Sequence, residues 1–291
     1  MLVPQDIRAA FPKRPVDAYK YSVGVVTIVG GSPRYANAPV IAGLGARAGG
    51  AGLVQLVVPD ASRIAAAALV PEATFTRQTS ACMPPHADVT VIGMGLGSAP
   101  SAEMLVSRLL SGSAGRFVLD ADALTVLANW YAQKQAALPV TEGQTIVLTP
   151  HAGEAARLLA CRHEDIQRDR MTAVRRIVDR YHAIVVLKGP HTLVAAPGLD
   201  HVFTCEAGNP FMAMGGMGDL LAGVLAARWA YLSRCRPEQP ASQGAYEAAC
   251  AAVWLHAAAS DSIVQADPPG DPSVVGTAHR IASLRVQLER A

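Results

Sequence analysis

The stretch GVVTIVGG, residues 24–31, decides the fold class of this chain. It is a nearly continuous apolar run, rich in β-branched residues and closed by two glycines, as in a strand buried on both faces. Similar runs follow at LVQLVVP (53–59), VTVIGMG (89–95), RFVLDAD (116–122), TIVLTP (145–150) and IVVLKG (184–189). Ala-rich segments separate them. This alternation predicts an α/β fold whose central, mostly parallel sheet is flanked by helices on both faces.

The segments between the apolar runs predict helices, and Asp60 is expected to cap the second of them. Polar loops are expected at 234–243 and 267–273. The expected helices cover residues 39–49, 61–69, 104–110, 123–129, 154–159, 171–181, 219–232 and 245–259.

Composition limits the classes of protein to which the chain can belong. Of its 291 residues, 51% are hydrophobic and 16% are charged, so it can bury a large core without disulfides or metal. No linker divides it, and we expect one domain over residues 1–291. The net charge of +2 is scattered, which argues against a nucleic-acid or membrane-surface partner. The five cysteines lack CxxC spacing, and no secretory signal or membrane span is evident, so we expect buried free thiols and a cytoplasmic protein.

In a parallel sheet, ligands bind beyond the carboxyl ends of the strands, so the residues after each apolar run are the ones to inspect. Glycines at 93, 95 and 97 follow one run, and Asp120 and Asp122 follow another. His151 with Glu154, and Lys188 with Gly189, follow the last two.

The strongest single signal is GNPFMAMGGMGD, residues 208–219, which leads into an apolar helix. Glycines let the backbone approach a ligand, and the free N–H groups of a first helical turn bind anions, so a phosphate would fit against Gly215 to Gly218. The alternative is a connecting turn with Asp219 as a helix-start carboxylate. The chain contains neither a GxxxxGK[ST] loop nor a GxGxxG fingerprint, so any nucleotide phosphate is expected at this turn.

Four of the residues that follow the strands leave alternatives open. Lys188 ends a very apolar run and either offers its charge to a phosphate or reaches solvent. His151 is compatible with a ligand contact and with a structural hydrogen bond, while Glu154 is expected to take part in helix capping. Asp120 and Asp122 could together hold Mg²⁺ or could cap the following helix, and capping is the favoured role for Asp122.

Taken together, the motifs resemble those of the ADP- or ATP-dependent NAD(P)H-hydrate dehydratases, a branch of the ribokinase-like superfamily. The resemblance covers residues from about 24 to 259. The chain departs from the family pattern at Met214 and Met217, where the family usually has threonine. The motifs, in family order, are GGSPRYANAP, ARAGGAGLV, VIGMGLG, VLDADAL, TPHAGEAARLL, VVLKGPHT and GNPFMAMGGMGDLLAGVLA.

The resemblance implies a ribokinase-like fold, a homo-oligomer and a role for each matching residue. Asp219 would be catalytic, and Mg²⁺ is expected although its ligands stay unassigned. The hydrated dinucleotide, NADHX or NADPHX, would lie against Ala38, Gly97, His151 and Asp219. The phosphoryl donor, ADP or ATP, would lie against Lys188, Gly189, Pro190, His191, Thr192 and Gly218, together with Gly215, Gly216 and Met217 of the expected anion site. Further candidates are Asn209, Asp120 and Glu154.

The implied reaction is phosphorylation of the substrate's hydroxyl group followed by loss of phosphate. Asp219 would accept the hydroxyl proton, with a pKa that we expect to be low at a helix N-terminus. One rival is a ribokinase-like kinase acting on a vitamin precursor or sugar. The other is a nucleotide-binding protein whose catalysis is impaired.

Overall fold

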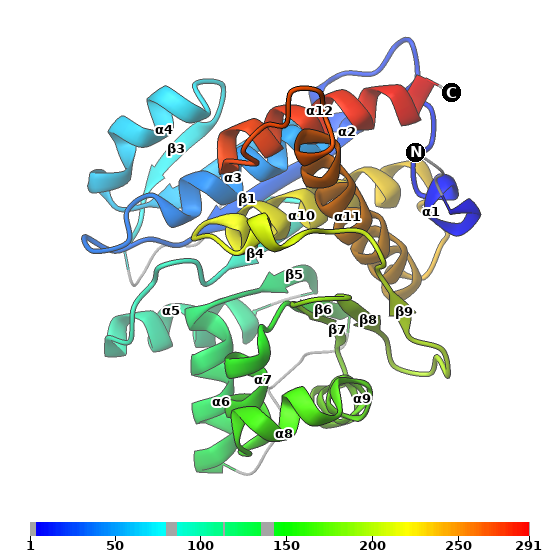
Figure 1. Cartoon of the computed structure of the whole chain (residues 1–291). Helices are drawn as coiled ribbons and strands as arrows, with labels where there is room; N and C mark the ends of the chain where they lie inside the picture. The colour runs from blue at the N-terminus through cyan, green and yellow to red at the C-terminus, as the bar shows by residue number, and fades with distance from the viewer. Residues whose placement is uncertain (1–3, 80–85, 113, 135–142, 291) are drawn as a thin grey trace.

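The computed structural model describes residues 4–79, 86–112, 114–134 and 143–290. In these ranges it contains one sheet of nine strands in the order β3-β2-β1-β4-β5-β6-β7-β8-β9 (Figure 1). The first seven strands in this order are parallel, and β8 and β9 extend the sheet as antiparallel strands. The strands are β1 (Val25–Val29), β2 (Leu53–Val58), β3 (Thr74–Arg77), β4 (Val89–Ile92), β5 (Gly115–Leu119), β6 (Gln144–Leu148), β7 (Ile184–Leu187), β8 (Leu193–Ala195) and β9 (Phe203–Thr204).

Helices cover both faces of the sheet, as Figure 1 shows. The upper layer in that view contains α1 (Gln5–Ala9), α3 (Ala38–Gly49), α4 (Arg63–Leu69), α10 (Met217–Cys235), α11 (Ala241–Val264) and α12 (Val274–Arg290). The lower layer contains α5 (Pro100–Leu110), α6 (Asp122–Lys134), α7 (Ala152–Leu159), α8 (His163–Arg168) and α9 (Arg170–Tyr181). Shorter pieces are α2 (Lys20–Val23) and the 3₁₀ turns η1 (Asp60–Ser62) and η2 (Pro210–Met212).

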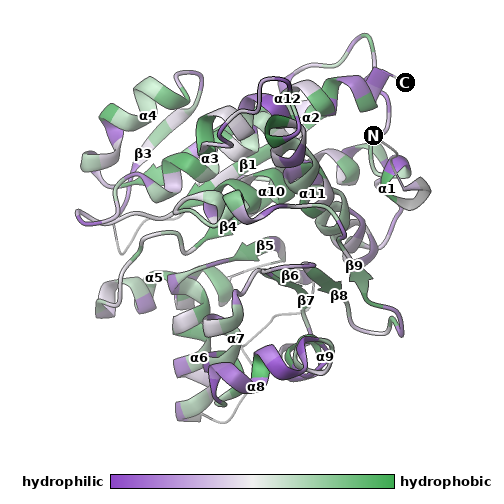
Figure 2. Ribbon diagram, viewed as in Figure 1, coloured by the Kyte–Doolittle hydropathy of each residue, from purple (hydrophilic) through white to green (hydrophobic). Residues whose placement is uncertain are grey.

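The two helical layers explain the unbroken apolar runs of the sequence. In β1, Val26 and Ile28 point into the core beneath α3 and α10, whereas Val29 points into the core on the opposite face. Every position of such a strand is buried, so apolar and polar residues do not alternate. Figure 2 shows apolar residues in the strands, α10 and α11, and polar residues along α8. The predicted α/β fold with a mostly parallel sheet is confirmed, and the six predicted strands correspond to β1, β2, β4, β5, β6 and β7.

Two glycines set the closest helix contact, between α3 and α10. A Cβ atom on Gly223 would lie 1.9 Å from the carbonyl oxygen of Ala42, and one on Gly45 would lie 2.1 Å from that of Leu220. No side chain fits at either position, so the backbones touch directly. This contact fixes the beginning of α10, which carries the glycine-rich turn.

The expected N-cap at Asp60 is wrong. Asp60 begins η1 instead, and α4 begins only at Arg63. The Asp60 carboxylate forms an ion pair with Arg77 at the end of β3, at 3.2 Å, and does not cap the helix. The pairing joins a loop to an edge strand, and local helix signals cannot reveal it.

The cysteines only partly fulfil the expectation of burial. Cys205 and Cys250 are buried free thiols, whereas Cys235 is exposed and Cys161 is intermediate; Cys82 lies outside the described residues. Within the described ranges, no helix is long and apolar enough to cross a membrane.

Candidate active site

The glycine-rich turn and the first turn of α10 carry the residue predicted to be catalytic. Gly216 precedes the helix with φ of +93°, a left-handed conformation that favours glycine. Met217 then points into the hydrophobic core and is only 4% exposed. Two residues later Asp219 lies in the first turn of the helix, partly covered by the surrounding protein.

Three ionisable side chains from other elements meet beside this turn. Lys188, directly after β7, places its Nζ 2.7 Å from Asp120 Oδ1 and 3.8 Å from Glu154 Oε2. Asp120 follows β5 and is 2% exposed, and Glu154 in α7 is 7% exposed. Lys188 was expected to serve a phosphate or reach solvent, but its ammonium is held between two buried carboxylates. An ammonium has three donors, and one of them forms the hydrogen bond to Asp120 while Glu154 is an ion-pair partner, so two donors remain for a ligand.

Gly218 brings the helix start against this ion-pair cluster. A Cβ atom there would lie 3.2 Å from Lys188 Nζ and 3.9 Å from Asp120 Oδ2. Glycine therefore leaves the approach to the ammonium open. Gly215, by contrast, has no atom within 4 Å of the position that a Cβ would take, so its side of the turn faces open space.

The electrostatics of Asp219 differ from the sequence prediction. Burial raises its pKa to about 7, and the negative charges of Asp120 and Glu154 add to this, while Lys188 opposes it. We expected a low pKa from the helix N-terminus, and this expectation is wrong because desolvation and neighbouring carboxylates outweigh the helix dipole. Asp219 is therefore a much stronger base than an ordinary aspartate.

Two of the ionisable groups near Asp219, Glu154 and Lys188, respond to the same surroundings. Burial raises the pKa of Glu154, against the influence of Lys188. For Lys188, burial lowers the pKa, but the ion pairs with Asp120 and Glu154 outweigh burial and leave it raised. Lys188 thus stays charged, and the cluster holds one permanent cation among several carboxyl groups.

His151 is the N-cap of α7. Its Nδ1 accepts hydrogen bonds from the backbone N–H groups of Gly153 (3.0 Å) and Glu154 (3.4 Å), and the Glu154 carboxylate accepts one from the backbone N–H of His151 (2.7 Å). This reciprocal capping box confirms the predicted capping role of Glu154. Burial and the charge of Lys188 lower the pKa of His151, which favours the neutral imidazole. The imidazole is 57% exposed, and its Nε2 lies 3.5 Å from Glu154 Oε1.

Asp122 has a role that the sequence did not suggest. The helix α6 begins at Asp122 itself, and its Oδ2 accepts the backbone N–H of Gly97 at 2.7 Å. The carboxylate thereby anchors the loop after β4, where Gly97 adopts φ of +78°. On the other side of this loop, a Cβ on Gly95 would lie 3.3 Å from the Cβ of Ala38, the first residue of α3. The structure thus brings the loop containing Gly97 beside the start of α3.

The segment from Lys188 to Thr192 is the turn between β7 and β8. Thr192 Oγ1 donates to the carbonyl oxygen of Gly189 at 3.0 Å, which closes the turn. Arg170 donates to the carbonyl oxygens of Leu187 (3.1 Å) and Lys188 (3.5 Å) from behind. We did not predict a role for Arg170, because an arginine in the first turn of a helix such as α9 gives no local signal.

His191 and Asn209, two candidates for ligand contacts, form contacts with other residues of the protein. His191 Nδ1 lies 3.2 Å from Glu206 Oε2 on the surface. Asn209 donates to Ser260 Oγ (3.0 Å) and Asp261 Oδ1 (2.8 Å) and accepts the backbone N–H of Phe211 (3.1 Å). Asn209 therefore braces the glycine-rich loop against α11.

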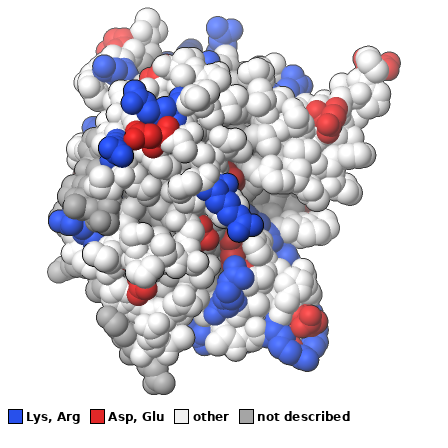
Figure 3. Space-filling view, turned by 90° about the vertical axis from the view of Figure 1, so that its left-hand side faces the viewer, with Lys and Arg blue, Asp and Glu red and all other residues white. Residues whose placement is uncertain are grey.

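Charged side chains gather on one face of the molecule, and the described residues form no metal cage by themselves. Figure 3 shows basic and acidic side chains gathered around a hollow in the middle of one face. In the described part of the chain, no three His, Cys, Asp or Glu side chains are grouped so that they could hold a metal ion by themselves.

Residues 26–274 match the NAD(P)H-hydrate dehydratase family. The chain belongs to this family. The dehydratase family includes a bifunctional NAD(P)H-hydrate repair enzyme Nnr of Gloeobacter violaceus, which is 39% identical over 273 residues, covering 90% of this chain and 49% of that enzyme. It also includes an ADP-dependent (S)-NAD(P)H-hydrate dehydratase of Neisseria meningitidis, 35% identical over 257 residues, covering 87% of this chain and 81% of that enzyme.

A solved dehydratase supports the family fold. The ADP/ATP-dependent NAD(P)H-hydrate dehydratase of Bacillus subtilis, co-crystallised with ATP and Mg²⁺, superposes with a TM-score of 0.82 at 24% identity, covering 97% of this chain and 96% of that one. This likeness confirms the fold expected from the family resemblance. The chain spans about half the length of the bifunctional relatives such as the Gloeobacter dehydratase.

Proposed function

We propose that this protein converts hydrated NADH and NADPH back to NADH and NADPH, using ADP as the phosphoryl donor and releasing AMP and phosphate. The proposal agrees with the names of its relatives, among them the ADP-dependent dehydratase of Neisseria meningitidis. It rests most directly on one feature of this chain, a carboxyl group of raised pKa beside an accessible glycine turn.

Asp219 suits the role of general base. A general base works best when its pKa lies near the operating pH, and burial raises the pKa of Asp219 to about 7. Near neutral pH, a large fraction of the carboxylate is ionised and still basic enough to accept a proton. An ordinary exposed aspartate would be ionised but a much weaker base.

The proposed reaction has two stages. The substrate's hydroxyl oxygen attacks the terminal phosphorus of ADP, its proton passes to Asp219, and AMP leaves with the electrons of the broken P–O bond. The lone pair of the ring nitrogen then expels inorganic phosphate by breaking the C–O bond. Loss of a proton from the neighbouring ring carbon restores the double bond. Hydroxide is a poor leaving group, and phosphorylation replaces it with a good one.

The surrounding residues position the phosphates and neutralise their charge. The first backbone N–H groups of α10 have no partner within the helix and suit an anion, and Gly215 before it has open space beside it. Lys188 donates one hydrogen bond to Asp120 and has Glu154 as a second ion-pair partner, which leaves two donors for phosphate oxygens. Phosphoryl transfer needs mainly such positioning and neutralisation.

Mg²⁺ is compatible with this arrangement. Proteins commonly hold Mg²⁺ through one or two carboxylates together with substrate phosphates and water, so a complete protein cage is not required. Asp120 Oδ2 points toward Gly218, at the side of the cluster where the phosphates are proposed, and Glu154 is the second carboxylate available. When bound there, Mg²⁺ would neutralise charge between the phosphates.

The remaining sequence predictions also stand as proposals. We propose that the hydrated dinucleotide lies against Ala38, Gly97 and His151. We also propose that the chain forms one domain, assembles into a homo-oligomer and works in the cytoplasm.

A coupled measurement tests the proposed function. NADHX is incubated with the protein, ADP and Mg²⁺ while the absorbance of reduced nicotinamide is followed and AMP is quantified. We expect NADH and AMP to appear in equal amounts, and no NADH without a nucleotide. Accumulation of a stable phosphate ester on another metabolite, without NADH formation from NADHX, would favour the kinase alternative. Tight ADP binding without turnover would favour the impaired nucleotide-binding protein.

A further inference from the structure

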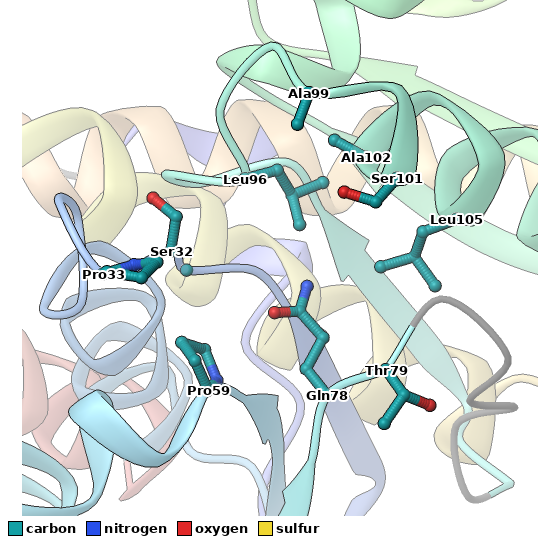
Figure 4. Close-up of a pocket in the computed structure, with 11 residues that line it drawn as sticks. Ser32, Pro33, Pro59, Gln78, Thr79, Leu96, Ala99, Ser101, Ala102 and Leu105 are labelled. Atoms are coloured by element: carbon teal, nitrogen blue, oxygen red, sulfur yellow. The ribbon is translucent and has the colours of Figure 1, made fainter.

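A separate cavity lies beyond the carboxyl ends of β1, β2 and β3. Its volume is about 280 Å³, and it is bounded by the loops after these strands and by the start of α5 (Figure 4). None of the residues identified above as nucleotide or substrate contacts lines it. We did not predict this cavity from the sequence.

The chemistry of the lining is uncharged. Ser32, Gln78, Thr79 and Ser101 contribute polar groups, while Leu96 and Leu105 are among the apolar walls. Among the described residues, those that line the cavity are all uncharged, so they offer no counter-ion to a phosphate. Flat apolar walls with a few hydrogen-bonding groups are typical of sites for an uncharged ring system, and the volume is just below the ~300–1,000 Å³ of sites for small ligands.

Gln78 is the most informative of the lining residues. Its backbone N–H donates to the carbonyl oxygen of Val58 at 3.0 Å, which fixes its position after β3. Figure 4 shows its side chain pointing into the cavity toward Ser32 and Leu96. Its carboxamide forms no hydrogen bond with another residue in the described ranges. A free carboxamide offers one acceptor and two donors, the combination that pairs with the edge of adenine.

One loop connects this cavity to the Asp219 site. Leu96 lines the cavity, and the next residue, Gly97, is bound to Asp122 at the start of α6. Asp122 in turn contributes to the electrostatic environment of Asp219. An extended ligand that follows this loop would therefore have one end near Asp219 and the other in the cavity.

We propose that this cavity binds the adenosine half of the hydrated dinucleotide, with the adenine edge on Gln78. This inference rests on the proposed function, because it assumes that the substrate is a dinucleotide whose reacting ring lies at Asp219. The pyrophosphate would remain outside the uncharged cavity, along the 93–97 loop.

The test compares the whole substrate with its half. The hydrated reduced nicotinamide mononucleotide carries the reacting ring but lacks adenosine, so it should not use the cavity. We expect Gln78→Leu to raise the KM for NADHX about 3–10-fold, as for loss of a neutral hydrogen bond, without changing kcat/KM for the mononucleotide. Ser101→Phe, which partly fills the cavity, should act in the same direction. Gln167→Leu, on the exposed side of α8, is the matched control and should change neither value.

The outcomes separate this inference from the proposed function. If wild-type protein turns over NADHX and the Gln78 and Ser101 variants show an unchanged KM, the adenosine assignment is wrong while the function stands. A rise in the KM for ADP instead of NADHX would also overturn it, because the cavity would then serve the phosphoryl donor. If no turnover is found at all, calorimetry with NADH and reduced nicotinamide mononucleotide still tests the cavity. Gln78→Leu must then weaken only NADH binding.

Discussion

Replacement of Asp219 by asparagine should remove activity and stabilise the fold. The variant keeps the shape of the side chain but cannot accept a proton, and loss of a positioned general base typically lowers kcat by about 10²–10⁴-fold. It also removes a carboxyl group whose ionisation is opposed by burial and by neighbouring Asp120. The same change should therefore lower kcat and raise the free energy of unfolding.

The size and sign of the stability effect follow from the pKa. The pKa of Asp219 rises from 3.8 to about 7 on folding, so between these values the folded chain holds a proton that the unfolded chain has released. Wild-type stability from this group is complete below about pH 4 and is lost as the pH rises to about 7. A shift of three pK units corresponds to a loss of at most about 4 kcal/mol in the free energy of unfolding. Because Asp219 retains contact with solvent, we expect the loss to be about 1–3 kcal/mol.

Thermal unfolding at several pH values, combined with steady-state kinetics, tests both effects. Asp219→Asn should exceed wild type in Tm by about 2–6 °C at pH 8 and by less at pH 5. Asp17→Asn, at an exposed carboxylate, is the control and should show neither the gain nor the loss of kcat. Wild-type kcat/KM should rise about tenfold per pH unit below pH 7. A variant with more than half of the wild-type kcat, or a Tm gain independent of pH, would refute the reasoning.

Three further substitutions test other parts of the site. Gly223→Ala should lower the free energy of unfolding by more than about 2 kcal/mol, because the new Cβ would lie 1.9 Å from the carbonyl oxygen of Ala42. Gly215→Ala is the control, because its Cβ would meet no atom within 4 Å, and it should lower this free energy by less than about 0.5 kcal/mol. Chemical denaturation measures both values. Met217→Thr should lower the free energy of unfolding by about 1–3 kcal/mol, because the methionine is packed in the core. Calorimetry should show a nearly unchanged affinity for ADP. A gain in ADP affinity of tenfold or more would show that a hydroxyl group at this position reaches the phosphate. Lys188→Met should weaken ADP binding at least about tenfold, because it removes the charge assigned to the phosphates. It should also destabilise the fold by about 2–5 kcal/mol, since two buried carboxylates lose their cation. An unchanged ADP affinity would remove the lysine from the nucleotide site.

The strands were predictable because burial on both faces leaves a continuous apolar signature. β1 and β7 are recognisable from their residues alone, whereas β3 is not. β3, with the sequence TFTR, is short and polar at the sheet's edge, and it pairs only with β2. Gln78 and the cavity that it lines follow this strand, so both were missed with it.

The site residues were predictable as types but not as a network. The sequence places Asp120, Glu154 and Lys188 after three different strands, and only the sheet order reveals that they meet. The surroundings of Asp219 were not predictable either, because we predicted its pKa only from the dipole of the helix that carries it. Burial and carboxylates from other elements determine that pKa, and no local pattern encodes them.

The most direct test of the central claim follows the oxygen atom of the substrate's hydroxyl group. NADHX labelled with ¹⁸O at this hydroxyl is converted with ADP, and the released phosphate and water are analysed by mass spectrometry. If the hydroxyl is phosphorylated and then expelled, each NADH formed should be accompanied by one AMP and one phosphate that carries the label. Label found in water, with unlabelled phosphate, would contradict the account.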